Sequence, residues 1–204
     1  MTTITVDQIF QNAETKHGLT LFSEADKAWV EGRLFEKSGK PYLRDAVSND
    51  ERPAKPEEIV RQLYLHRLLE QYQYGGRVAV EVGVHFGTEV KRADIIIYDK
   101  DRPSVPYIIV EVKKPKRNDG KEQLRSYCNA TGAPIGVWTN GKEIEYWHRR
   151  DPNYFEPLTD IPTATMSFAD FLNKPFTLPD LIEFEKQQAQ TQPSLKELIV
   201  EMED

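Results

Sequence analysis

The sequence predicts one α/β domain in which a mixed, partly antiparallel β-sheet is flanked by helices. The first observation is that three segments typical of strands follow a predicted helix closely along the chain. The second is a further helical segment, which separates the third strand from a fourth. The third is an Asn-Gly pair between two strand-like runs, which is the strongest short-range signal for a hairpin. These features are strands at residues 77–86, 91–99 and 106–113, a helix at 121–131, and the hairpin at Asn140-Gly141.

Composition restricts the class of protein. The chain has 204 residues, of which 39% are hydrophobic and 29% charged, as in a soluble globular protein. No apolar run approaches the roughly 18 residues that a membrane span needs, and the first ten residues lack the pattern of a secretory signal. Cys128 is the only cysteine, which excludes an internal disulfide and fits a reducing compartment. We therefore expect a cytoplasmic protein with no membrane association.

The central helix begins at Pro56, in "PEEIVRQLYLHRLLEQY". Proline suits the first helical turn, and the acidic side chains of Glu57 and Glu58 suit the positive end of the helix dipole. An apolar stripe runs along the segment, and Gly75-Gly76 is expected to stop it. Residues 56–150 are predicted to form the core of the domain.

The strands that follow differ in their faces. Valines alternate with Ala79, Glu81 and Gly83 in the first strand, which indicates one more polar face. Residues 95–97 and 108–110 are continuous apolar runs, as expected of strands covered on both faces. Glu81 lies on the neighbouring strand and could approach the end of the sheet that carries Asp94 and Glu111, but it is interpreted as an ion-pair partner for Arg77 or a lysine.

The two ends of the chain give weaker patterns. Residues 1–55 are predicted to be an N-terminal extension containing a hairpin over residues 29–43 that turns at Ser38-Gly39. The alternative for the start of this segment is a helix capped by Ser23 with Asp26 three residues later. Residues 151–204 are predicted to form a loop followed by an acidic helical extension. Seven acidic and two basic residues lie between positions 180 and 204, so this end carries most of the net charge of −6.

One constellation points to chemistry. Asp94 begins the second strand, and Glu111 and Lys113 end the third on one face, because strand side chains alternate. If these strands pair as a hairpin, the two carboxylates meet at one end of the sheet, where they repel each other unless a cation neutralises them. Mg²⁺ takes oxygen ligands and usually only one or two carboxylates, which leaves positions for water and phosphate. Lys113 would add a positive charge for a phosphate. Taken alone, however, Glu111 and Lys113 could be a solvated ion pair at a strand end.

The run "KRADIIIYD", "YIIVEVKKPK", "QLRSYCNATGAPIGVWTNG" resembles the PD-(D/E)XK nuclease superfamily and, more narrowly, the N-terminal nuclease domain of type I restriction enzyme R (motor) subunits. The resemblance covers roughly residues 55–147. It implies a restriction-endonuclease-like core with the order α-β-β-β-α-β, an N-terminal hairpin and a C-terminal helical extension. One departure is Ala93, which stands where the family often has proline.

The resemblance also implies site residues. Asp94, Glu111 and Lys113 take the places of the family's catalytic residues, and Gln123 and Tyr127 match its Gln-x-x-x-Tyr motif. Metal ligands would be Asp94, Glu111 and the Val112 carbonyl, with Glu58 preferred over Glu57 as an additional acid. Taken alone, Glu58 is an acid that stabilises the helix dipole.

A basic cluster surrounds these residues. Residues 113–125 contain six basic and two acidic side chains, a local charge of +4. Such a segment beside a metal site is expected to contact the phosphate backbone of DNA, although a solvated loop would have the same composition. The predicted DNA-binding residues are Lys114, Lys116, Arg117, Lys121 and Arg125.

These features together predict a Mg²⁺-dependent endonuclease, with Mn²⁺ as a substitute, that hydrolyses DNA phosphodiester bonds in defence against foreign DNA. The implied partners are double-stranded DNA, an ATP-dependent motor domain or subunit, and a methyltransferase and specificity complex. The alternative from another class is a docking or DNA-binding module that keeps the fold without catalysis. A nuclease acting on RNA stays open as well, because the metal chemistry does not depend on the sugar.

Overall fold

The computed structural model describes residues 4–12 and 19–173. The chain divides into two compact units, Met1–Phe168 and Ala169–Asp204, and of the second only residues 169–173 are described. The helices are α1 (Val6–Asn12), α2 (Glu24–Glu31), α3 (Pro56–Glu70), α4 (Lys121–Thr131) and α5 (Phe168–Asn173). The strands are β1 (Leu34–Lys37), β2 (Lys40–Arg44), β3 (Glu51–Pro53), β4 (Val78–Phe86), β5 (Glu89–Tyr98), β6 (Pro106–Val112), β7 (Ile135–Thr139), β8 (Ile144–Asp151) and β9 (Tyr154–Leu158).

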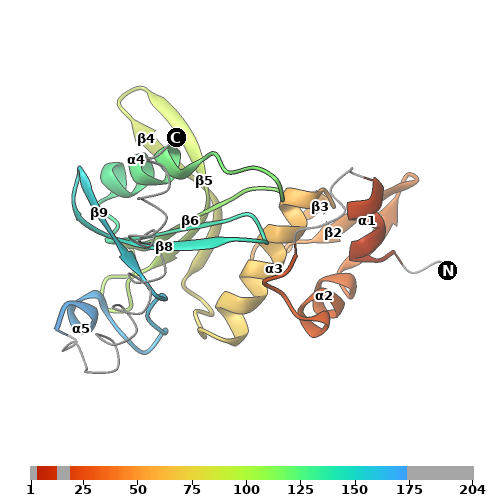
Figure 1. The fold of residues 1–204 in the computed structure, drawn as a ribbon, viewed down its shortest axis with the longest axis horizontal. Coiled ribbons are helices and arrows are strands. Elements are labelled where there is room, and N and C mark those ends of the chain that lie inside the picture. Colours follow the sequence, from red (N-terminus) through yellow and green to blue (C-terminus); the bar gives the residue numbers. More distant parts are fainter. Residues whose placement is uncertain (1–3, 13–18, 174–204) are drawn as a thin grey trace, which may run out of the picture. The chain divides into compact units, whose positions relative to one another are not determined.

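The core is a six-stranded mixed sheet with the order β4-β5-β6-β7-β8-β9. Every pair in it is antiparallel except β6 and β7, which are parallel and joined by the crossover helix α4. Figure 1 shows α4 lying over the sheet, with the β4–β5 hairpin extending beyond it. The predicted α/β class and the order helix–strand–strand–strand–helix–strand are therefore confirmed.

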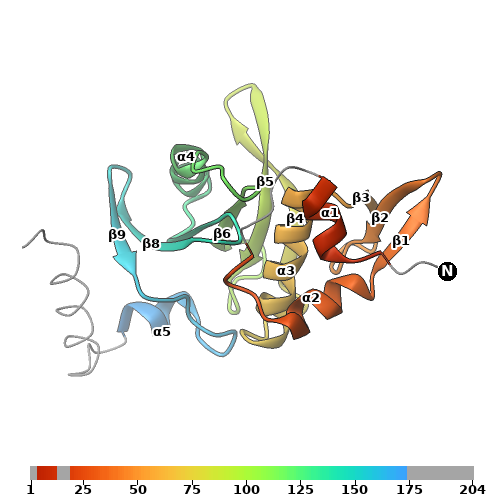
Figure 2. The ribbon, with the colours of Figure 1, turned by 45° about the vertical axis from the view of Figure 1, so that its right-hand side comes forward.

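Helix α3 lies between the six-stranded sheet and the N-terminal elements (Figures 1 and 2). It packs against α1 and α2 on one side and approaches β6 on the other. Consistent with this position, its buried residues lie all around the helix and include the polar Arg61 and Gln62. A helix covered in this way is part of the core, and its polar side chains need partners inside the protein.

The N-terminal extension contains both structures that its sequence suggested. Ser23 caps α2, and the Ser23–Asp26 capping box has both of its hydrogen bonds. A short hairpin, β1–β2, follows with its turn at Ser38-Gly39, and β3 adds a third strand. The preferred hairpin over residues 29–43 was thus wrong at its start, because the capped helix continues to Glu31.

The segment after residue 151 contains a strand that was expected to be a loop. β9 pairs with β8 at the edge of the sheet although it contains Pro157. Proline is tolerated on an edge strand because its missing N–H can face away from the sheet. The predicted acidic helices beyond residue 173 lie outside the described residues.

Two smaller expectations concern membranes and the thiol. Within residues 4–12 and 19–173, no helix has the length and hydropathy that a bilayer span requires. Cys128 is buried on α4, and burial raises the pKa of its thiol to about 12. A thiol in this environment packs as a small apolar group, as expected.

Candidate active site

Strand pairing brings Asp94 and Glu111 together. Ile95 of β5 lies opposite Val110 of β6 in the antiparallel register. Continued by one residue, this register places Asp94, which precedes Ile95, across from Glu111, which follows Val110. The backbone N–H of Val112 donates a hydrogen bond of 2.8 Å to Oδ2 of Asp94. Both carboxylates therefore lie at the same end of the sheet, where the sequence predicted them.

Lys113 completes the set. Its ammonium group donates a short hydrogen bond to Oε1 of Glu111. Its backbone N–H donates to the carbonyl oxygen of Thr139, at the end of β7, over 2.8 Å. Lys113 is thus held by the sheet just beyond the end of β6, with its side chain only 12% exposed.

The protein environment disfavours the charged form of both acids. Burial, and then the negative charge of Asp94, raise the pKa of Glu111 to about 7, despite the opposing effect of Lys113. Burial also raises the pKa of Asp94, although the Val112 N–H and Lys113 act to lower it. Two buried carboxyl groups with raised pKa values are relieved when a cation binds between them.

One oxygen of Glu111 has no partner among the described residues. The residue is 1% exposed, and its Oε2 accepts no hydrogen bond. An unsatisfied buried carboxylate oxygen is costly, because the group has lost water without gaining a donor. This oxygen is the feature of the site that best fits a bound cation.

The donor set fits a metal ion that keeps much of its water. Among the described residues, no three His, Cys, Asp or Glu side chains are grouped so that they could hold a metal. Mg²⁺ needs fewer, since one or two carboxylates and waters complete its octahedron. Asp94 and Glu111 are such a pair, and a main-chain carbonyl such as that of Val112 is a suitable further oxygen donor.

Gln123 and Tyr127 meet on one face of α4. The Gln123 amide donates to the Tyr127 hydroxyl over 2.6 Å, and that hydroxyl donates to the carbonyl oxygen of Arg92 over 2.9 Å. Arg92 lies two residues before Asp94 on β5. Burial raises the pKa of Tyr127, and the charges of Glu111 and Asp94 act in the same direction. The motif therefore joins α4 to the strand that carries the first acid.

Of the two acids in the first turn of α3, Glu57 is the one that faces the pair. Its Oε2 accepts from the backbone N–H of Lys114 over 3.3 Å, and its charge acts on the pKa of Asp94, Glu111 and Lys113. Glu58 is instead bonded to Arg61 and to Gln62. The preference for Glu58 as an additional metal ligand therefore has no geometric support, because both of its oxygens are already taken.

Three residues around the site were not among the predicted site residues. Arg61 lies with one guanidinium nitrogen 4.0 Å from Oδ1 of Asp94. Glu81 pairs with Arg61 and Arg52, not with Arg77 or a lysine. A Cβ on Gly120 would lie 2.5 Å from Cε of Lys113. Two of them left a signal in the sequence. Glu81 lay on a strand beside the site, and a glycine before a predicted helix, such as Gly120, can mark close approach or a positive φ.

Three of the five predicted DNA-binding residues form ion pairs with acidic side chains of this protein. Asn140 and Trp138 donate to the carbonyl oxygens of Arg117 and Asp119, which ties this loop to the end of β7. Lys114 is exposed beside the site, and Lys116 has a positive φ of 77°. The ion pairs in the segment are Arg117–Asp119, Lys121–Glu145 and Arg125–Glu122.

The first prediction concerns Gly120. Gly120→Ala should lower the free energy of unfolding because φ is +91° there and the new Cβ would collide with Lys113. The matched control is Gly132→Ala at the other end of α4, where φ is +76° but nothing lies within 4 Å. Both variants carry the backbone strain, and we expect Gly120→Ala to lose up to about 1 kcal/mol more, because the end of the Lys113 side chain must move away from its ion pair with Glu111. Urea denaturation measures the difference, and equal losses would contradict the close approach.

The second prediction concerns pH. Without divalent ions, the free energy of unfolding should fall as pH rises from about 5 to about 7. In that range folded Glu111, with its pKa near 7, still holds a proton that the unfolded chain, with its ordinary value of 4.5, has released. The loss should be on the order of 3 kcal/mol. Denaturation in EDTA at several pH values measures it.

Glu111→Gln should remove most of this slope and be more stable than the wild type at pH 8. The control is Glu122→Gln, which changes an acid that is 84% exposed and should leave the slope unchanged. A Glu111→Gln protein that is less stable than the wild type at every pH would show that the carboxylate stabilises the fold.

Comparisons with known proteins find one family and one solved structure to report. A solved fragment of a protein assigned as the HsdR subunit of a type I restriction enzyme from Vibrio vulnificus YJ016 is 21% identical, with a TM-score of 0.43. The match covers 56% of this chain and 25% of that chain. No curated protein matches. The family model described as type I restriction enzyme R protein N terminus matches residues 56–162, more than half of the sequence. The chain therefore belongs to the family of type I restriction enzyme R protein N-terminal domains.

Proposed function

We propose that this domain hydrolyses phosphodiester bonds of double-stranded DNA with Mg²⁺, as the nuclease part of a type I restriction system. The observation that supports it most is the buried Glu111, whose Oε2 has no partner and whose pKa is raised beside Asp94. A structural ion pair would have no reason to leave that oxygen unsatisfied. A divalent ion would satisfy the oxygen and neutralise both acids.

Each residue has a proposed role. Asp94, Glu111 and the Val112 carbonyl would hold the ion, and Glu57 would orient water on it. When bound, Mg²⁺ would stabilise negative charge on the phosphate and lower the pKa of a coordinated water. Lys113, already beside Glu111, would stabilise the charge that develops on the phosphate oxygens. Hydrolysis adds a hydroxyl group to phosphorus and breaks the bond to the sugar oxygen, which takes up a proton.

Gln123 and Tyr127 would act through position. Because Tyr127 is hydrogen bonded to the carbonyl of Arg92, it fixes the part of β5 that ends at Asp94. The N-terminus of α4 lies close to Lys113 through Gly120, and its free N–H groups could bind a phosphate oxygen. The proposed partners are an ATP-dependent motor domain or subunit and a methyltransferase and specificity complex.

A docking module without catalysis is the second candidate. The observation that favours it is the pairing of Arg117, Lys121 and Arg125 with acids, which lowers the charge available to DNA. A module of this kind would need no divalent ion. Metal binding therefore separates the two functions.

The third prediction tests the chemistry. Asp94→Ala and Glu111→Ala should each lower Mg²⁺-dependent cleavage on the order of 10²-fold or more and weaken Mn²⁺ binding, because each removes an oxygen ligand. Lys113→Ala should lose rate to a similar degree but keep metal binding, since its charge acts mainly in the transition state. Calorimetry with Mn²⁺ and cleavage of duplex DNA, with and without partner subunits, measure the two effects.

The matched control for Lys113→Ala is Lys100→Ala, which removes a lysine charge at the opposite end of β6 and should keep the rate. Duplex RNA in the same assay tests the nuclease acting on RNA. Wild-type protein that binds no divalent ion and cleaves neither substrate with its partners present would favour the docking module.

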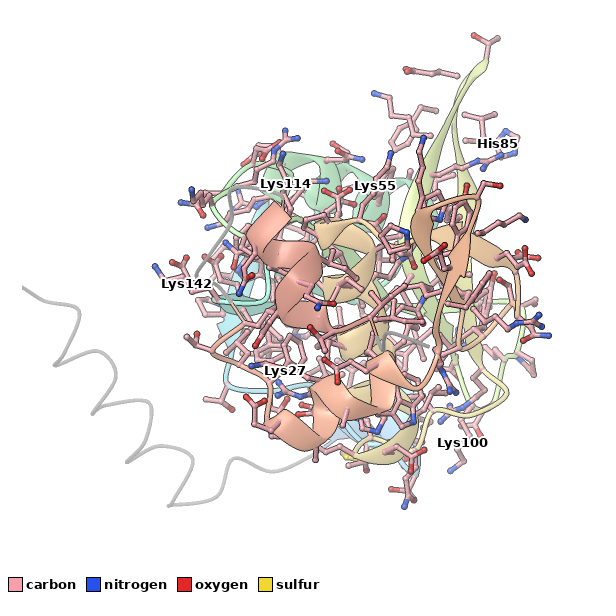
Figure 3. All side chains as sticks on the ribbon, turned by 90° about the vertical axis from the view of Figure 1, so that its right-hand side faces the viewer. Lys27, Lys55, His85, Lys100, Lys114 and Lys142 are labelled. Atoms are coloured by element: carbon pink, nitrogen blue, oxygen red, sulfur yellow. The ribbon has the colours of Figure 1, made fainter. Side chains whose placement is uncertain are left out.

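The fourth prediction concerns affinity for DNA. With a net charge of −6, the chain should bind duplex DNA weakly, without sequence preference and with strong salt dependence. Lys114→Ala should reduce the slope of log K against log salt by about 1, because it removes one phosphate contact. Lys100→Ala is the control, since Lys100 lies in the loop before β6, at the opposite end of that strand from the site (Figure 3). Anisotropy titrations at several salt concentrations measure both, and a slope equal to that of the wild type in Lys114→Ala would remove Lys114 from the interface.

A further inference from the structure

Six polar side chains form a closed ring beside the acid pair. They come from the N-terminal sheet and the turn after β2, from α3, and from β4, so the ring joins three parts of the fold. Three of them are at most 5% exposed. In order around the ring they are Asp45, Arg52, Glu81, Arg61, Glu58 and Gln62.

Arg61 occupies the side of the ring that faces the site. It donates to Oε1 of Glu81 over 2.9 Å and to Oε1 of Glu58 over 3.3 Å, with a second, short bond to Glu58. The same nitrogen that bonds Glu81 lies 4.0 Å from Oδ1 of Asp94. One guanidinium group therefore faces three carboxylates at once.

The other half of the ring fixes those carboxylates. Gln62 donates to both Glu58 and Asp45 over 2.9 Å. Arg52 lies 3.2 Å from Asp45 and 3.0 Å from Glu81. These contacts hold Glu58 and Glu81 in place independently of Arg61.

The backbone of Glu81 is strained so that its side chain can join the ring. Its φ is +51°, in the left-handed region that non-glycine residues rarely adopt. Val80 pairs with Ile95 and Val82 with Ala93, so Glu81 lies opposite Asp94 in the β4–β5 register, yet the ladder skips that position. Strain of this kind persists only when surrounding contacts hold it, and it concentrates at functional sites.

Arg61 is held as a permanent charge. Burial alone would lower its pKa, but the charge and hydrogen bonds of Glu58, with Glu81, raise it above the usual value. The carboxylate of Glu81 has a lowered pKa, chiefly through its hydrogen bond to Arg61. Unlike a bound metal ion, which can dissociate, this guanidinium is a fixed part of the chain.

We propose that Arg61 is a positioning residue that occupies the place of a second divalent ion, so that the site holds one metal between Asp94 and Glu111. The inference deepens the proposed function and rests on it for the first ion. As they stand, Glu58, Glu81 and Asp94 are not grouped closely enough to hold a metal. All three carboxylates face the guanidinium of Arg61, and without it their negative charges would attract a divalent cation. With Arg61 present, their charge is already neutralised.

The test replaces Arg61 with a neutral side chain of similar length. Arg61→Met should bind one Mn²⁺ more per chain than the wild type, counted by calorimetry and by electron paramagnetic resonance of free Mn²⁺. Its melting temperature should rise with Mn²⁺ by several degrees more than that of the wild type, because the ion replaces a missing charge. Arg61→Lys keeps a positive charge and should keep the count of the wild type.

The matched control is Arg52→Met. Arg52 pairs with Glu81 as Arg61 does, but the described contacts do not place it beside Asp94. Its loss leaves the guanidinium of Arg61 between Glu58 and Asp94, so the number of bound ions should not change. A gain in Arg52→Met equal to that in Arg61→Met would mean that any loss of ring charge creates a metal site, and would overturn the role assigned to Arg61.

The outcomes separate this inference from the proposed function. The number of Mn²⁺ ions bound per wild-type chain tests the proposed function, and a chain that binds none would contradict that function. The increase from the wild type to Arg61→Met tests the inference, and no increase would overturn it. An Arg61→Met chain that stays unfolded even at saturating Mn²⁺ would also overturn it, because a divalent ion then does not replace the guanidinium.

Discussion

The antiparallel register between β5 and β6 is the constraint on which the site depends. It places Asp94 directly across from Glu111, and the Val112 N–H locks the first acid in place. The backbone positions of both acids are thereby fixed by the pairing of the two strands. The groups around the two acids are positive: Lys113, Arg61 and the N-terminus of α4 all lie at the same end of the sheet.

The sequence predicted the parts of the site that depend on strand period and strand order. Asp94, Glu111 and Lys113 could be placed together because side chains alternate along a strand and the neighbouring strands were recognisable. The helix over residues 121–131 and the turn at Asn140-Gly141 carried local signals strong enough to fix their positions. For these elements, local preference and tertiary packing agree.

Other features depend on contacts that no local pattern encodes. Glu57 and Glu58 point in directions about 100° apart around the axis of α3. Which of them faces the site depends on how the helix packs on both sides. Arg61 would be an ordinary surface partner of Glu58 on an exposed helix. Glu81 was interpreted as a partner of Arg77 or a lysine, but with its left-handed backbone it pairs with Arg61 of α3. Pro157 argued against a strand, and only its place at the sheet edge permits one.

The ring of polar side chains has a consequence for the modular boundary of this domain. Sequence similarity to the family begins at residue 56, yet Asp45 and Arg52, which close the ring, lie before it. A core excised at that boundary would leave Glu81 and Gln62 each short of a partner inside the protein. The unit that can be transplanted between proteins with its electrostatics intact is therefore longer than the unit that sequence similarity delimits, and it includes the small N-terminal sheet.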